Sequence, residues 1–251
     1  MTDKIVRKDS DEWRTYETPN GELKSVTNYL NLLNKPALVP WAAKLTAEYF
    51  KDEIDAILAG ELDIKEMDLD DIVRQAKAHY KKKSEEAMDF GSEVHHYITE
   101  YFQFGQLPLD GPMNKLVVAA IAKITGELRM TVGGVELMVF YRKAYAGTLD
   151  LIGAGTPVGH KTQKNIVVDI KTGKGRVYEE ALIQVSAYAL AQESMSGAKV
   201  DLAVILPLNK ETGEAGDLVV LNRTAWKKYA KAFLALVKYD NESMRARVRS
   251  K

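Results

Sequence analysis

Cysteine is absent from the sequence. Its absence excludes disulfide bonds, thiolate zinc sites, iron–sulfur clusters and cysteine nucleophiles. Any metal ion must therefore be bound by oxygen or imidazole ligands. The sequence also lacks an apolar run long enough to cross a bilayer, and its first residues lack the apolar core of a signal peptide. We therefore expect no contact with a membrane and a cytoplasmic location.

An excess of charge of either sign is absent as well. The 251 residues include 35 Lys and Arg and 35 Asp and Glu, which gives a formal net charge of zero. This balance argues against a protein that coats nucleic acid by bulk electrostatic attraction. Hydrophobic residues make up 46% and charged residues 28% of the chain, as in ordinary globular proteins. We expect a single folded domain over residues 1–251.

Apolar residues recur at helical spacing through most of the first half of the chain. The first 25 residues differ, because they are polar and contain the turn signal Pro19-Asn20-Gly21, which indicates an extended arm or a short hairpin. We predict helices from Ser25 to Pro36 and at about 40–59, 69–103 and 112–129. The sequence does not decide whether the third of these helices is broken at Asp89-Phe90-Gly91.

Beyond Gly133-Gly134 the sequence changes to β-branched, aromatic and alternating residues, which are typical of strands. Strands are predicted at 135–141, 145–152, 165–171, 200–206 and 217–221, and helices at about 178–194 and 224–239. This order predicts an α/β fold with a central mixed sheet flanked by helices. We expect residues 1–130 to be a mostly helical N-terminal part and residues 131–251 to be the α/β core.

Two charged residues end an apolar strand at Asp169-Ile170-Lys171. The two-residue period of a strand puts Asp169 and Lys171 on the same face. Asp150 interrupts the preceding apolar strand, and it approaches Asp169 if the two strands pair as a hairpin. Two carboxylates at one point suit Mg²⁺ or Mn²⁺, which prefer oxygen ligands. The pattern therefore predicts a divalent metal site beside a lysine.

Polar side chains on two predicted helices extend this candidate site. Gln184 and Tyr188 are four residues apart, so they share a helical face and are placed to contact a phosphate or the lysine. Gly91 precedes His95 by one helical turn, and an imidazole can complete a metal shell made otherwise of carboxylates. The remaining histidines are interpreted as surface or capping residues: His79, His96 and His160.

Taken together, these motifs resemble those of the PD-(D/E)XK nuclease superfamily, and more narrowly its RecB-like exonuclease branch in bacteriophage-type forms. That branch carries G-x-x-x-H on a helix, G-x-x-D on a strand, D/E-x-K on the next strand and Q-x-x-x-Y on the following helix. The matching segments, in the same order, are Gly91 to His95, Gly147 to Asp150, Asp169 to Lys171 and Gln184 to Tyr188. The resemblance covers about residues 88–206 and implies a restriction-endonuclease-like core with an N-terminal helical elaboration.

The resemblance implies metal-assisted hydrolysis of DNA phosphodiesters by an exonuclease of DNA recombination, repair or replication, in a bacterial or phage-infected cell. The metal ligands that it implies, for one or two ions of Mg²⁺ or Mn²⁺, are His95, Asp150, Asp169 and the backbone carbonyl of Ile170. Lys171 would orient the attacking water or stabilise the charge that develops on the phosphate. Glu136 is a further candidate ligand or substrate-facing acid. A version with the four-cysteine iron–sulfur cluster of the CRISPR spacer-acquisition nuclease is excluded.

DNA is the expected partner, attracted to a basic rim for which the candidates are Lys174, Arg176 and the tail residues Arg245, Arg247, Arg249 and Lys251. The chain is too short to include the helicase half of a RecB-type enzyme. We expect it to act alone or with a separate recombination or single-strand-binding protein. Three alternatives stay open: an endonuclease of the same fold, a catalytically inactive DNA-binding module, and an α/β domain whose acids only cap strands.

Overall fold

The computed structural model describes residues 4–10, 13–63, 67–107 and 111–249, with side chains of the last helix described as far as residue 243. The chain divides into two compact units, one made of Met1–Leu33 and Glu93–Lys251 and the other of Asn34–Ser92. Within the described residues, no helix is both long enough and apolar enough to cross a membrane. The larger unit contains every candidate site residue from His95 onward.

The smaller unit is helical. It consists of α2 (Leu38–Leu58) and the first part of α3 (Leu69–Phe104). The Tyr49 hydroxyl donates a hydrogen bond of 2.9 Å to the side-chain oxygen of Gln75, which joins the two helices. α3 runs without interruption through residues 89–91, where the sequence left a break open. Both helices lie close to their predicted ranges.

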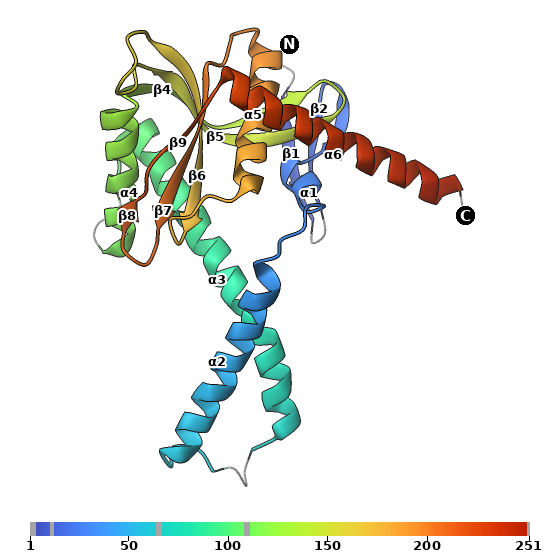
Figure 1. Ribbon diagram of the computed structural model, residues 1–251, viewed down its shortest axis with the longest axis vertical. Helices are drawn as coiled ribbons and strands as arrows, with labels where there is room; N and C mark the ends of the chain where they lie inside the picture. The colour runs from blue at the N-terminus through green and yellow to red at the C-terminus, as the bar shows by residue number, and fades with distance from the viewer. Residues whose placement is uncertain (1–3, 11–12, 64–66, 108–110, 250–251) are drawn as a thin grey trace. The chain divides into compact units, whose positions relative to one another are not determined.

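Six strands of the larger unit form one mixed sheet (Figure 1). Their bounds are β4 (Met130–Tyr141), β5 (Tyr145–Gly155), β6 (Lys164–Gly173), β7 (Leu202–Asn209), β8 (Glu214–Ala215) and β9 (Val219–Asn222). β4, β5 and β6 pair antiparallel in chain order, β6 and β7 pair parallel, and β8 and β9 each pair antiparallel with β7. The predicted mixed α/β sheet is confirmed, whereas β8 was not predicted.

Helices cover both faces of this sheet, with α5 and α6 on one face and α4 on the other (Figure 1). α5 (Glu179–Ser196) is the crossover that the parallel strands β6 and β7 require, and α6 (Arg223–Arg249) packs against it. α4 (Pro112–Ala122) contacts β7 and β8 and continues into a π-helical segment, Lys123–Glu127. The buried face of α6 has helical spacing and consists of Trp226, Ala230, Phe233 and Val237.

The first strands of the chain form a separate three-stranded sheet beside β5. Its antiparallel strands are β1 (Val6–Asp9), β2 (Arg14–Thr18) and β3 (Gly21–Lys24), and α1 (Val26–Leu30) follows them. A backbone bridge joins Ser25 to Ala146 of β5, and Tyr16 and Leu23 pack against the same alanine. The sequence predicted an arm or a short hairpin here, and the structure adds a third strand and a docking site on the main sheet.

A charged hydrogen-bond network fixes the end of α5. The guanidinium of Arg223, at the start of α6, contacts both carboxylate oxygens of Glu193, and its Nη2 lies 2.7 Å from Oε1. The backbone N–H of Val200 donates to the same carboxylate at 3.1 Å, and the carbonyl of Val200 accepts from Arg223 at 2.9 Å. The network therefore joins α5, α6 and the segment that enters β7.

We predict that Glu193→Gln lowers the free energy of unfolding by about 1–2 kcal/mol at neutral pH, because hydrogen bonds to a charged group are removed. Burial alone would raise the pKa of Glu193, but Arg223 and the Val200 N–H outweigh burial and hold this pKa below its usual range. The ionised carboxylate therefore stabilises the fold above its unfolded pKa, and this contribution disappears as the pH falls through the lowered folded-state pKa.

Urea denaturation at neutral and at acid pH measures this difference. The curves of parent and variant should be separated at neutral pH and converge in acid. Glu242→Gln is the matched control, because Glu242 is exposed and, within the described residues, its one ion pair is with the exposed Lys238 at 3.8 Å on α6. An equal destabilisation of the control, or a difference that persists in acid, would contradict the assignment.

Candidate metal centre

Two acids lie on neighbouring strands at the centre of the main sheet. β5 pairs antiparallel with β6, which is the condition on which the predicted approach of Asp150 to Asp169 depends, and Leu151 is opposite Val168 in this register. Asp150 Oδ2 accepts a hydrogen bond of 2.6 Å from the backbone N–H of Ile170, the residue that follows Asp169. Asp150 is 9% exposed and Asp169 is 1% exposed. The strand pairing therefore brings both carboxylates into one buried region.

A third carboxylate and a histidine join Asp150. In the pairing of β4 with β5, Val135 is opposite Leu151, which puts Glu136 opposite Asp150. Nδ1 of His95, on α3, lies 3.5 Å from Asp150 Oδ1 and 3.7 Å from Glu136 Oε1. One potential ligand atom from each of these residues lies within 4.8 Å of the others. The three side chains could therefore hold one metal ion.

Glu136 adopts an unusual backbone conformation for a strand residue. Its φ angle is +46°, in the left-handed region that residues with a side chain seldom occupy. Such a conformation costs on the order of 1–3 kcal/mol, and it persists only where the surrounding structure imposes it. The strain at Glu136 coincides with its position opposite Asp150. The sequence suggested this residue only as a weak candidate, because the register that brings it here depends on tertiary pairing.

Asp169 lacks the hydrogen bonds that a buried carboxylate normally has. The ammonium of Lys171 lies 2.8 Å from Oδ2 as an ion pair, which agrees with the predicted common face of the two residues. Among the described residues, neither oxygen of Asp169 accepts a hydrogen bond of good geometry. Buried carboxylate oxygens that accept no hydrogen bond are unfavourable, and a bound ion is one way to satisfy them. A hard divalent cation fits this donor set.

The electrostatic environment of the centre favours positive charge. Burial alone would lower the pKa of His95, but Asp150 and Glu136 outweigh burial and raise it to about 10. Burial would likewise lower the pKa of Lys171, whereas Asp169 and Asp150 raise it. Burial raises the pKa of Asp169, while His95 outweighs burial at Asp150 and lowers the pKa there. Three acidic side chains thus lie near two side chains, His95 and Lys171, that can carry positive charge.

A glutamine and a tyrosine of α5 lie together as predicted. Gln184 Nε2 donates a hydrogen bond of 3.0 Å to the Tyr188 hydroxyl, and Tyr188 is 4% exposed. Burial, with a smaller effect of the Asp169 charge, raises the pKa of Tyr188 well above its usual value. A Cβ added to Gly147 would lie 2.5 Å from Cε1 of Tyr188. Glycine at 147 is therefore needed for the tyrosine ring to pack against β5.

The structure describes only some of the residues proposed for the basic rim. Lys174 makes an ion pair of 3.0 Å with Glu211, and the exposed Arg176 makes no ion pair within the described part of the chain. The side chains of the tail residues Arg245, Arg247 and Arg249, and the whole of Lys251, lie outside the described residues. The contribution of all these residues to DNA binding stays a prediction.

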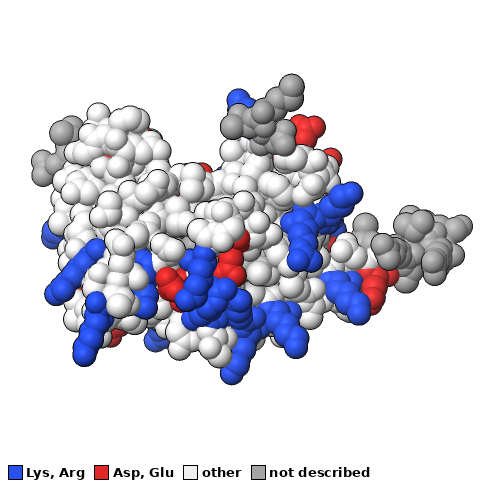
Figure 2. Space-filling model, turned by 90° about the horizontal axis from the view of Figure 1, so that it is seen from above, with Lys and Arg blue, Asp and Glu red and all other residues white. Residues whose placement is uncertain are grey.

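Exposed basic side chains are also present outside the predicted rim. Figure 2 shows Lys and Arg side chains gathered on one side of the viewed face. The exposed lysines near the start of α6 are Lys227, Lys228 and Lys231. They were not among the predicted candidates, because helical lysines are usually solvated surface residues. Local basic surfaces therefore exist despite the net charge of zero.

Comparison with known proteins adds no family assignment: no protein-family model and no curated protein matches this chain.

We expect Gly147→Ala to lower the free energy of unfolding by about 1–3 kcal/mol, because the new Cβ forces the Tyr188 ring to move. The effect should be non-additive with Tyr188→Ala, which removes the ring that the methyl group meets. Chemical denaturation of both single variants and the double variant measures the coupling. Gly173→Ala is the control, since a Cβ there meets nothing within 4 Å. Additive effects in the double variant would show that the packing of the ring on Gly147 does not matter.

Proposed function

We propose that the chain is a metal-dependent deoxyribonuclease that hydrolyses DNA phosphodiester bonds, in the specific form of an exonuclease of DNA recombination, repair or replication. The observation that carries the proposal is the buried pair of Asp169 and Lys171, in which a carboxylate that is 1% exposed has, among the described residues, only the ammonium 2.8 Å from its Oδ2 as a partner. A site that only stored a cation would have no need of an ammonium group beside its central carboxylate. Hydrolysis of a phosphodiester uses both groups.

The residues of the centre fit a divalent cation, Mg²⁺ or Mn²⁺. Asp150 and Asp169 offer hard carboxylate oxygens, which both ions prefer, and His95 and Glu136 lie within reach of Asp150. The resemblance adds the backbone carbonyl of Ile170, whose N–H is already bound to Asp150. When bound, a divalent cation polarises the phosphate oxygens and activates water for attack on phosphorus.

Lys171 is the positive group between the buried acid and solvent. Its side chain is 32% exposed, so the ammonium is accessible while it lies 2.8 Å from Asp169. An ammonium in this position can hold the attacking water by a hydrogen bond and offset negative charge that develops on the phosphate. The ion pair with Asp169 holds that ammonium beside the buried carboxylate, where it is still partly exposed to solvent. The role proposed for Lys171 therefore follows from its partner and its exposure together.

Tyr188 offers a hydrogen-bond donor in a fixed position. Its hydroxyl accepts a hydrogen bond from Gln184, which leaves the tyrosine proton free to be donated. The ring is held by its packing against Gly147, and its raised pKa keeps the hydroxyl protonated. We assign this donor to a phosphate oxygen or to the attacking water. Gln184 acts through Tyr188 as a positioning residue.

The exonuclease form rests on His95 and the Gln184–Tyr188 pair, which the sequence shares with the RecB-like branch. An endonuclease of the same fold would use the same acids and lysine but would not require a DNA end. A catalytically inactive module is disfavoured, because both acids and the lysine are present. DNA is the proposed partner in each case.

Metal binding should stabilise the protein by an amount that grows with the logarithm of the free metal concentration above Kd. We expect Mn²⁺ at a hundredfold excess over its Kd to raise the free energy of unfolding by about 2.7 kcal/mol. Asp169→Asn should abolish this increase, and in EDTA it should unfold earlier than the parent, because it leaves Lys171 without its ion-pair partner. Thermal unfolding with and without Mn²⁺ measures both effects. Glu211→Gln, at an exposed acid, should keep the full shift, and a shift retained in Asp169→Asn would place the metal elsewhere.

Cleavage of DNA tests the function itself. The parent should degrade end-labelled linear DNA in Mg²⁺ or Mn²⁺ and leave closed circular DNA intact, because an exonuclease needs an end. Asp169→Asn should show no cleavage, and Lys171→Ala should be slower by about a hundredfold or more, as when one charge-stabilising group is removed from an active site. Cutting of intact circles would favour the endonuclease form. Full activity in either variant, with folding verified by circular dichroism, would exclude the proposed centre.

A further inference from the structure

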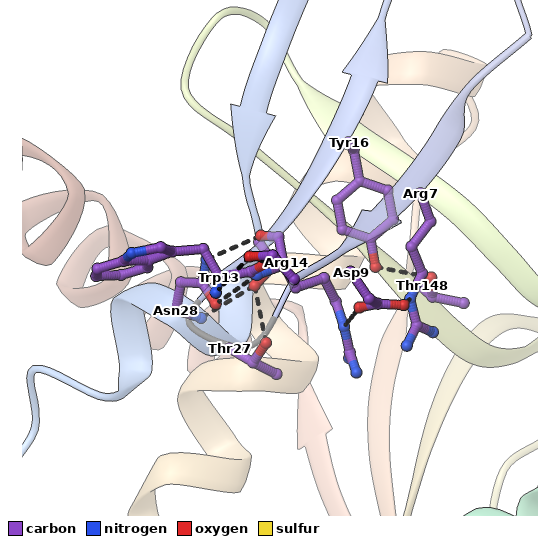
Figure 3. A network of polar contacts seen from close by, with 10 residues as sticks. Arg7, Asp9, Trp13, Arg14, Tyr16, Thr27, Asn28 and Thr148 are labelled. Atoms are coloured by element: carbon purple, nitrogen blue, oxygen red, sulfur yellow. Dashed lines mark hydrogen bonds and ion pairs between the residues drawn. The ribbon is translucent and has the colours of Figure 1, made fainter.

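The three-stranded N-terminal sheet carries charged residues on the face that reaches β5, the strand of Asp150. Arg7, Asp9, Arg14 and Tyr16 share one face of this sheet, because Arg7 pairs with Tyr16 and Asp9 pairs with Arg14. The Tyr16 hydroxyl lies 2.9 Å from the Thr148 hydroxyl of β5 (Figure 3). This hydrogen bond attaches the face to the strand that carries Asp150.

The arginines are held as a pair by one acid. Nε of Arg7 donates to Oδ2 of Asp9 and Nε of Arg14 donates to Oδ1, both at 2.8 Å, so the carboxylate lies between the two guanidinium groups (Figure 3). Two positive charges thus share one negative charge. Each hydrogen bond uses Nε, and within the described residues the terminal Nη groups of both arginines make no hydrogen bond. These forked donors suit a phosphate.

Hydrogen bonds to the carbonyl of Arg14 fix the position of its backbone. The side chain of Asn28, on α1, donates to the carbonyl of Arg14 at 2.8 Å, and the backbone N–H of Ser25 donates to the same carbonyl at 3.0 Å. Asn28 is 8% exposed, whereas the side chains of Arg7 and Arg14 are 38% and 39% exposed. A buried amide therefore orders the backbone while the guanidinium groups face solvent. Such preorganisation lowers the cost of binding an anion.

The arginine pair is also linked to the centre through neighbouring side chains. Thr148 and Asp150 are two residues apart on β5, about 7 Å along the strand. Arg7 is the cross-strand neighbour of Tyr16, which is hydrogen-bonded to Thr148. A DNA strand that reaches Asp150 would therefore pass near the arginine pair.

We infer that Arg7 and Arg14 form a phosphate clamp that binds an internal phosphodiester of the DNA strand whose cleavage the metal centre performs. The inference rests on the proposed function, and it names the N-terminal sheet as the element that positions the substrate. Asp9 holds the two guanidinium groups in register and competes with the phosphate for them. Removal of Asp9 and removal of the arginines should therefore have opposite effects on DNA binding.

Fluorescence anisotropy in EDTA, where no cleavage occurs, tests the clamp on its own. The probe is a short fluorescein-labelled single-stranded oligonucleotide with a 5′-hydroxyl end, so that only internal phosphates are available. Arg7→Gln with Arg14→Gln should weaken binding by about tenfold or more, and should reduce the slope of log K against log salt by about 0.7 for each phosphate that is no longer neutralised. Asp9→Asn should strengthen binding.

Two controls lie on the opposite face of the same sheet, where Lys8 and Glu17 form an exposed ion pair of 3.2 Å. Lys8→Gln matches the charge change of an arginine variant, and Glu17→Gln matches that of Asp9→Asn. Both controls should change binding less than their counterparts. The clamp is excluded if Lys8→Gln weakens binding as much as the removal of an arginine, or if Asp9→Asn weakens binding as the arginine variants do. The second result would show that the arginines only support Asp9 structurally.

The same proteins separate this inference from the proposed nuclease function. With Mg²⁺ or Mn²⁺ present, the arginine variants should raise KM for linear DNA and change kcat little. A parent that binds DNA through the arginines but never cleaves it would refute the nuclease and leave the clamp intact. A parent that cleaves DNA, with arginine variants that bind and cleave as it does, would refute the clamp alone.

Discussion

The fold forces three carboxylates and one histidine into a space where like charges repel. Glu136 lies opposite Asp150 across two strands, and the buried Asp169 is on the next strand without a hydrogen bond from the described residues. Only His95 and Lys171, among the residues that the structure describes there, supply positive charge. Backbone pairing and core burial outweigh this repulsion in the folded chain, and the arrangement is costly unless a cation joins it.

Each side chain of the centre depends on packing elsewhere in the larger unit. The pairing of β4, β5 and β6 sets which acids meet, and the Ile170 N–H fixes Asp150. Glycine at 147 leaves room for the Tyr188 ring, whose hydroxyl Gln184 then orients. The N-terminal sheet reaches the same strand through Tyr16 and Thr148. The candidate metal centre is thus supported by strands, by α5 and by the start of the chain.

Much of this arrangement follows from local patterns in the sequence. Alternation predicted the common face of Asp169 and Lys171, helical spacing predicted that of Gln184 and Tyr188, and the apolar runs predicted the strands that carry both acids. The position of Glu136 could not be read in this way, because it depends on cross-strand register and on a left-handed backbone. The third N-terminal strand also escaped prediction, since strands this short and polar show little apolar alternation. Local periodicity can be recognised in the sequence, whereas pairings between distant segments become known only from the folded structure.

The central claim is that these acids bind a divalent metal, and a crystal structure with Mn²⁺ tests it most directly. The anomalous scattering of manganese locates the ion without reference to activity. We predict an anomalous peak within coordination distance of carboxylate oxygens of Asp150 and Asp169, with His95 or Glu136 completing the shell. A map that shows no peak there at saturating Mn²⁺, or a peak only at other acids of the chain, would contradict the claim.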